Sequence, residues 1–91
     1  MGKGILITGK VGYHLTDIKK GELGELSKIQ EELDELKDAV KQDCLILQLV
    51  ELSDLVGAIE AFLEKNFSSI SLKDLKSMSD ITVRAFKNGH R

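Results

Sequence analysis

The chain has 91 residues, of which 42% are hydrophobic and 31% are charged, and it contains no proline. This is enough for one small folded domain over residues 1–91. The net charge of −2 excludes the basic surface of a typical nucleic-acid-binding protein, and the single cysteine excludes an intrachain disulfide. Because apolar runs are short and no signal-peptide pattern is present, we expect a cytoplasmic protein with no membrane or nucleic-acid partner.

Residues 1–20 are expected to form a short N-terminal arm, either extended or folded as a hairpin. The stretch GILIT at residues 4–8 is rich in strand-forming residues, and glycines bracket a possible turn after it. The longer stretch GILITGKV is similar to a phosphate-binding loop, but Val11 stands where that loop carries a magnesium-binding hydroxyl. We therefore interpret it as a strand with a glycine turn. His14 and His90 are expected to lie outside the helical core, without a catalytic partner.

The rest of the chain predicts an all-α core over residues 22–88, arranged as an antiparallel helical bundle. Apolar residues recur in steps of three and four over residues 22–41, which is typical of an amphipathic helix. A second helix is expected over residues 44–65 and a third over residues 72–88. The loop NFSSIS separates the last two helices.

Capping residues set the expected helix ends. Asp43 is predicted to cap the second helix, and Cys44 at its start is expected to be a buried, unreactive hydrophobe. The sequence SLKD from Ser71 is a weak capping box for the third helix, and Gly89 is a natural stop.

The second predicted helix is apolar on nearly all sides, so we expect it to be the most buried element. Three helices cannot cover such a helix completely. Small domains with surplus apolar surface usually associate. We therefore predict a homodimer or a homotetramer built as a dimer of dimers.

Two pairs of carboxylates lie in the first two helices at the same spacing. Glu32 and Glu35 are three residues apart, as are Glu51 and Asp54, so each pair occupies one helix face. If the hairpin folds at residue 43, all four carboxylates lie at the same height along the two antiparallel helices. Four oxygen ligands of this kind suit Mg²⁺ or Mn²⁺ rather than zinc. The alternative is that the carboxylates belong to solvated helix faces.

The sequences EELDE and ELSD resemble the E-x-x-E and E-x-x-D signature of the MazG-like all-α nucleoside triphosphate pyrophosphohydrolases. Phosphoribosyl-ATP pyrophosphohydrolases and all-α dUTPases share this signature. The resemblance covers about residues 22 to 88 and leaves out the N-terminal arm. The C-terminal sequence SDITVRAFKNGHR also resembles the ends of short, single-domain members, including phage-encoded ones.

This resemblance implies Mg²⁺-dependent hydrolysis of a nucleoside triphosphate to a monophosphate and pyrophosphate. By the matching motif positions, the catalytic and metal-binding residues would be Glu32, Glu35, Glu51 and Asp54. Family members assemble as dimers or tetramers, with the site near the subunit contact. Two alternatives are phosphoribosyl-ATP hydrolysis, which uses the same metal chemistry, and a non-catalytic helical module for oligomerisation or binding.

Basic residues provide candidates for binding the substrate phosphates. Lys28 lies one turn before Glu32 on the same predicted face. A basic stripe on the third helix, interrupted by Asp80, consists of Lys73, Lys76, Arg84 and Lys87. From these we take Lys28, Arg84 and Lys87 as candidate substrate-binding residues, although a plain solvated face explains the stripe equally well. Glu31 is not assigned a role, because it points about 100° away from Glu32 on a helix.

Overall fold

The computed structural model describes residues 14–89, and the regular elements of this part of the chain are three helices. Helix α1 spans Leu26–Lys41, α2 spans Leu45–Asn66 and α3 spans Leu72–Lys87. The expected all-α class is therefore confirmed for the described residues. The predicted strand or hairpin at residues 4–8, like His90, lies outside them.

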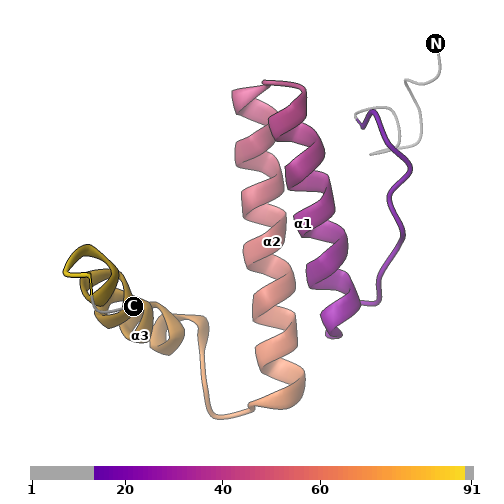
Figure 1. The fold of residues 1–91 in the computed structure, drawn as a ribbon. Coiled ribbons are helices and arrows are strands. Elements are labelled where there is room, and N and C mark those ends of the chain that lie inside the picture. The colour runs from indigo at the N-terminus through magenta and orange to yellow at the C-terminus, as the bar shows by residue number, and fades with distance from the viewer. Residues whose placement is uncertain (1–13, 90–91) are drawn as a thin grey trace.

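Helices α1 and α2 form an antiparallel hairpin, and α3 projects from the end of α2 to one side (Figure 1). Within these three helices α3 contacts α2 but not α1. The segment that precedes α1 runs back along the outer side of that helix (Figure 1). The interior of the structure is thus a seam between α1 and α2, and residues 14–20 cover it from the α1 side. These residues are the described part of the N-terminal arm and are called the arm below.

Helix α1 begins at Leu26 rather than near residue 22 as predicted. The residues just before it include Gly24, whose φ of 92° lies in the left-handed region that a helix does not use. Gly21 approaches the backbone of Ser27 so closely that a Cβ on residue 21 would overlap it. These two glycines form a turn that brings the arm back along α1, so the helix starts after them.

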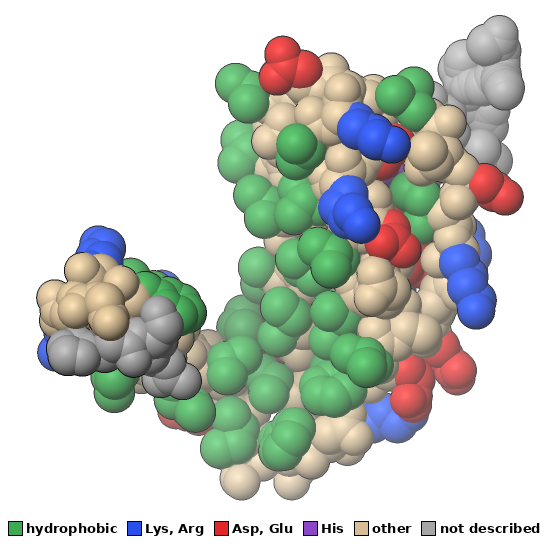
Figure 2. Space-filling model, in the orientation of Figure 1, with side chains coloured by type: hydrophobic (Ala, Val, Ile, Leu, Met, Phe, Trp, Pro, Cys, Tyr) green, Lys and Arg blue, Asp and Glu red, His purple; other side chains and the backbone are tan. Residues whose placement is uncertain are grey.

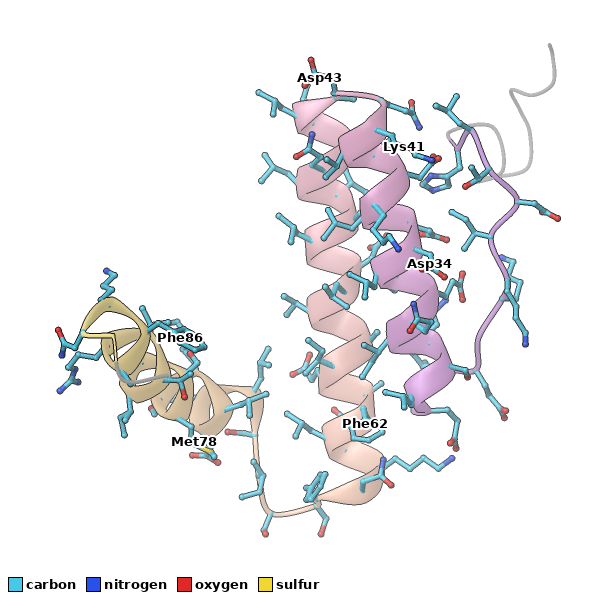
Figure 3. All side chains as sticks on the ribbon, viewed as in Figure 1. Asp34, Lys41, Asp43, Phe62, Met78 and Phe86 are labelled. Carbon is cyan, nitrogen blue, oxygen red and sulfur yellow. The ribbon has the colours of Figure 1, made fainter. Side chains whose placement is uncertain are left out.

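Asp43 ends α1 and does not cap α2, contrary to the sequence prediction. Its φ is 55°, and its N–H donates to the Val40 carbonyl at 3.0 Å while the Cys44 N–H donates to the Ala39 carbonyl at 3.4 Å. This is the hydrogen-bond pattern of a Schellman motif, with an aspartate in the position that glycine usually takes. Asp43 lies at the tip of the hairpin (Figure 3). Cys44 is the N-cap of α2, makes no side-chain cap and is exposed, so its predicted burial is wrong.

We expect Asp43→Gly to stabilise the protein by about 0.5–1 kcal/mol, because glycine adopts a left-handed φ without steric cost. Asp43→Ala is the matched control, since it also removes the carboxylate but keeps a Cβ, and it should destabilise the protein. Thermal melting measures both variants. If the two variants shift the melting temperature equally, the carboxylate rather than the backbone conformation is the important feature of Asp43.

The sequence interpretation of α3 agrees with the structure at its N-terminus. Ser71 accepts from the Asp74 N–H at 3.2 Å, and the Asp74 carboxylate accepts from the Ser71 N–H at 3.0 Å. These two hydrogen bonds confirm the capping box. The Asp74 carboxylate accepts from both the N–H and the hydroxyl of Ser71, and these two hydrogen bonds hold the pKa of Asp74 below its ordinary value. Gly89 follows the helix with a φ of 76°, as expected for a helix stop.

Helix α2 is not the buried element that its composition predicts. Among residues 14–89 the buried hydrophobic residues are Ala39, Ala58 and Leu63. Figure 2 shows hydrophobic side chains over the length of α2 and on the neighbouring side of α3. Exposed large apolar residues on α2 include Leu45, Ile46, Leu49, Val50, Leu52 and Val56. In one copy of the chain, many large apolar side chains of residues 14–89 are therefore exposed to water, because α2 packs against α1 on only one side.

Candidate metal centre

The seam between α1 and α2 is lined by carboxylates where a helical hairpin usually carries leucines. On α1 the buried side chains are those of Glu31, Glu32, Glu35, Asp38 and Ala39. Spacings of three and four residues place these side chains along one face of the helix. Across the seam Glu51 of α2 is 1% exposed.

The four carboxylates of the two sequence motifs lie together in this seam. Glu32, Glu35, Glu51 and Asp54 each offer an oxygen, and these oxygens all lie within 4.8 Å of one another. Three of the four residues are buried, while Asp54 is not, so solvent reaches the cluster from the side of Asp54. The structure thus brings together the carboxylates that hairpin geometry places at one level.

Electrostatics makes this cluster suitable for a cation. Two like charges about 5 Å apart repel by about 3 kcal/mol at an effective dielectric near 20. Burial of three of the carboxylates adds the cost of removing them from water. A divalent cation held by these oxygens would turn the repulsion into attraction, and oxygen atoms are the ligands that hard cations prefer. The buried acidic cluster could therefore hold a metal ion.

Lys28 lies at one end of the cluster. Its ammonium group is 3.1 Å from a Glu31 oxygen and 3.2 Å from a Glu32 oxygen. Burial lowers the pKa of Lys28, but hydrogen bonds to Glu31 and Glu32 outweigh this effect, and the pKa lies above its ordinary value. Lys28 is therefore a charged group beside the carboxylates.

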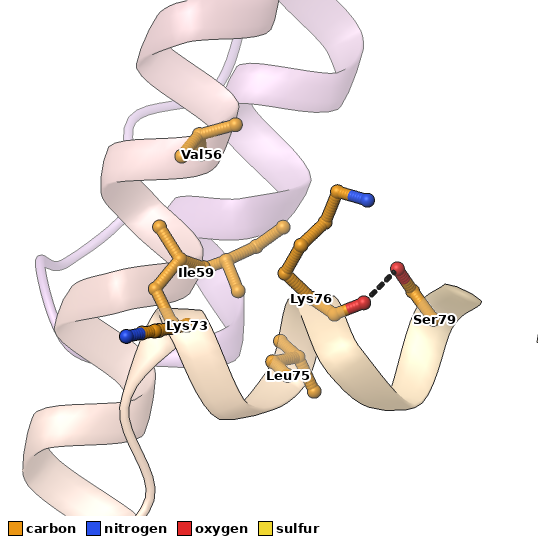
Figure 4. Close-up of a pocket in the computed structure, with 7 residues that line it drawn as sticks. Val56, Ile59, Lys73, Leu75, Lys76 and Ser79 are labelled. Carbon is orange, nitrogen blue, oxygen red and sulfur yellow. Dashed lines mark hydrogen bonds between the residues drawn. The ribbon is translucent and has the colours of Figure 1, made fainter. Parts of the chain in front are cut away.

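The other two candidate phosphate-binding residues, Arg84 and Lys87, lie on α3. Because α3 does not contact α1, neither residue lies beside Glu32 or Glu35 of the same chain. Lys76, from the same basic stripe, makes a 2.6 Å ion pair with Asp80. Lys76 also lines an apolar groove of about 480 Å³ between α2 and α3 (Figure 4). Two members of the stripe, Lys73 and Lys76, thus line this groove rather than the acidic seam.

Glu31 belongs to the buried cluster, although its direction on an isolated helix gives no reason to include it. It is 1% exposed and accepts from the Gly21 N–H at 2.8 Å as well as from Lys28. Burial raises the pKa of Glu31, but the Gly21 N–H and the Lys28 ammonium outweigh it, and the pKa lies below its ordinary value. Glu31 is buried because the arm covers it, and the periodicity of α1 alone cannot predict this burial.

His14 is the largest departure from the sequence prediction, which places it outside the core without a partner. Its side chain is 5% exposed, and its Nδ1 lies 2.9 Å from the Asp38 carboxylate. On the other side of the ring, Nε2 lies 3.4 Å from a Glu51 oxygen and 3.9 Å from a Glu35 oxygen. His14, Glu35 and Glu51 form a second group that could hold a metal ion.

Asp38 fixes the arm to α1. Its carboxylate accepts from the Leu15 N–H at 2.9 Å, from Gln42 at 3.0 Å and from the Thr16 hydroxyl at 3.3 Å. Burial raises the pKa of Asp38, but the hydrogen bonds from Leu15, His14 and Gln42 outweigh it, and the pKa lies below its ordinary value. The sequence feature that indicates a polar partner for Asp38 is its position, three residues after Glu35 on the same face of the helix.

No protein-family model, curated protein or solved structure matches this chain. The fold and the residues of the seam are therefore the basis for any functional assignment. Within residues 14–89, no helix is both long and apolar enough to cross a membrane. The described part of the chain defines a helical protein with a carboxylate-rich candidate metal centre.

Proposed function

We propose that this chain is a Mg²⁺-dependent nucleotide pyrophosphohydrolase of the MazG-like type. It would convert a nucleoside triphosphate into a monophosphate and pyrophosphate. The observation that carries the proposal is the meeting of the E-x-x-E and E-x-x-D pairs, with one oxygen from each of Glu32, Glu35, Glu51 and Asp54 within 4.8 Å of the others. The resemblance of these two motifs to the MazG-like signature supplies the reaction class.

In this proposal each part of the seam has a separate task. Glu32, Glu35, Glu51 and Asp54 would hold Mg²⁺, which when bound neutralises phosphate charge and lowers the pKa of an attacking water. Lys28 would attract the phosphates to the end of the cluster, where its ammonium group already lies 3.2 Å from Glu32. Substrate would approach from the side of Asp54, because the arm leaves only a pocket of about 80 Å³ beside His14 and Glu35.

Homodimer or homotetramer formation is part of the same proposal. The supporting observation is the exposed apolar surface of α2, together with Met78, Ile81 and Phe86 of α3. In a second copy of the chain these residues would find an apolar partner surface of the same kind. Assembly would also allow Arg84 and Lys87 of one copy to approach the carboxylates of another.

Two other functions remain as rivals. Phosphoribosyl-ATP hydrolysis would use the same carboxylates and the same cation. A non-catalytic helical module would need the apolar surface but not the acidic seam. Five buried carboxylates are costly in a module that only assembles, because each loses its hydration on folding. This cost favours the enzyme.

The reaction is tested by incubating the protein with Mg²⁺ and a panel of ribo- and deoxyribonucleoside triphosphates, with phosphoribosyl-ATP included. We expect pyrophosphate and a monophosphate as products. Glu51→Gln and Asp54→Asn should each lower kcat/KM by at least about 100-fold, or about 2.7 kcal/mol of transition-state stabilisation. Glu60→Gln is the matched control, since Glu60 is an exposed glutamate on the same helix, and it should keep the wild-type rate. Orthophosphate and a diphosphate as products would contradict the assigned bond, and full activity in both site variants would contradict the site.

A further inference from the structure

The imidazole of His14 adds a nitrogen donor to the acidic seam, from a part of the chain outside the two carboxylate motifs. The side chain of His14 is only 5% exposed. The donor atoms of His14, Glu35 and Glu51 all lie within 4.8 Å of one another. This group differs from a purely acidic cluster because one member is an imidazole, which in its neutral form offers a directed nitrogen lone pair.

Asp38 determines which ring nitrogen carries that lone pair. An ionised carboxylate only accepts hydrogen bonds, and Asp38 accepts them from the Leu15 N–H at 2.9 Å and from Gln42 at 3.0 Å. The contact of 2.9 Å between Asp38 and Nδ1 of His14 therefore places the proton of the neutral ring on Nδ1. The lone pair is then on Nε2, the nitrogen that faces Glu51 and Glu35. A histidine that donates its other N–H to a carboxylate is the usual arrangement of a metal-binding histidine.

The spacing of the donor atoms also fits a metal ion. Two ligand atoms that each lie about 2.1 Å from a tetrahedrally coordinated ion are about 3.4 Å apart. Nε2 of His14 is 3.4 Å from a Glu51 oxygen and 3.9 Å from a Glu35 oxygen. Small shifts of the side chains would bring all three atoms to one ion.

We propose that His14, Glu35 and Glu51 form a second metal site, which takes a transition-metal ion such as Zn²⁺, Co²⁺ or Mn²⁺ in preference to Mg²⁺. Imidazole is a good ligand for transition ions, whereas Mg²⁺ prefers oxygen ligands. The second site shares Glu35 and Glu51 with the four-carboxylate cluster, so the seam would hold two neighbouring cations bridged by these glutamates. The proposal does not require nucleotide hydrolysis.

Binding of Co²⁺ tests the second site, because the visible absorption of Co²⁺ reports its ligands. Wild-type protein, His14→Gln and Thr16→Ala are titrated with Co²⁺ and followed by absorption and calorimetry. His14→Gln should weaken the binding at this site at least about tenfold and change the spectrum. Thr16→Ala is the matched control, because Thr16 is in the same arm and contacts Asp38 but supplies no metal ligand. It should leave both the affinity and the spectrum unchanged.

Two further measurements separate this site from the proposed function. Circular dichroism shows whether His14→Gln is folded, and a Mg²⁺-induced rise in its melting temperature shows that the four carboxylates remain together. Wild-type protein that binds Co²⁺ through His14 but does not respond to Mg²⁺ would support the second site and contradict the proposed function. Identical Co²⁺ affinity and spectra in wild type and His14→Gln, or no Co²⁺ binding by folded wild type, would overturn the second site.

Discussion

Mg²⁺ is expected to raise the melting temperature of the wild-type protein and to have a much smaller effect on Glu51→Gln. A ligand that binds only the folded state stabilises it by RT ln(1 + [L]/Kd), which is about 2.7 kcal/mol at a hundredfold excess over Kd. For a domain of this size that corresponds to a rise of roughly 10–20 °C. Glu51 is the residue to change because it is 1% exposed and belongs to both candidate metal groups.

The experiment compares melting in EDTA with melting in millimolar Mg²⁺ at fixed ionic strength. Constant ionic strength is needed because salt also screens the repulsion between carboxylates. The exposed Glu60→Gln removes the same charge from the same helix and should respond to Mg²⁺ like wild type. Equal shifts in wild type, Glu51→Gln and Glu60→Gln would mean that Mg²⁺ acts by general screening, and the four-carboxylate site would then be wrong.

Leu49→Asp is expected to dissociate the proposed homo-oligomer. Leu49 is 67% exposed in the single chain and lies among the apolar residues of α2. A symmetric interface contains every substitution twice. A charge buried without a partner costs about 2 kcal/mol or more in each copy, so the dissociation constant of a dimer should rise by about 10³-fold.

Light scattering over a range of protein concentrations measures this effect. Leu23→Asp is the matched control, because Leu23 is also 67% exposed but precedes α1 rather than lying on α2. It should leave the assembly intact. A wild-type protein that is monomeric at micromolar concentration would refute the oligomer, and equal dissociation by both variants would show that α2 is not the interface.

Much of the local structure of residues 14–89 could be predicted from the sequence. The 3.6-residue periodicity and the turn residues give three helices whose ends differ from the structure by at most one residue, except at the start of α1. The capping box at Ser71 is confirmed by its two hydrogen bonds with Asp74. The common position of the four carboxylates along the hairpin could also be predicted. In an antiparallel hairpin with a short turn, residues of α1 and α2 that lie side by side have residue numbers with a constant sum. Their role as metal ligands stays a prediction.

The errors arise where backbone conformation or long-range contacts decide the outcome. An aspartate between two helices can either end the first helix or cap the second one. The left-handed φ of Asp43 shows that it ends α1. Cys44 begins an apolar stretch, but its exposure depends on whether another element packs there. The apolar residues of α2 predict a buried helix, yet α3 turns away from α1 and leaves them uncovered.

The sequence by itself determined that this part of the chain is helical, where its helices run and that two acidic pairs meet across a hairpin. These features depend on contacts within one helix or across one short turn, so residue spacing is sufficient to derive them. Only the tertiary structure decided that His14, Glu31 and Asp38 belong to the same seam. The contact between His14 and Asp38 joins residues 24 positions apart through an irregular arm, for which no periodicity exists. The docking of the arm through Gly21 and Leu15 therefore adds a nitrogen atom, from His14, to the carboxylate oxygens of the hairpin.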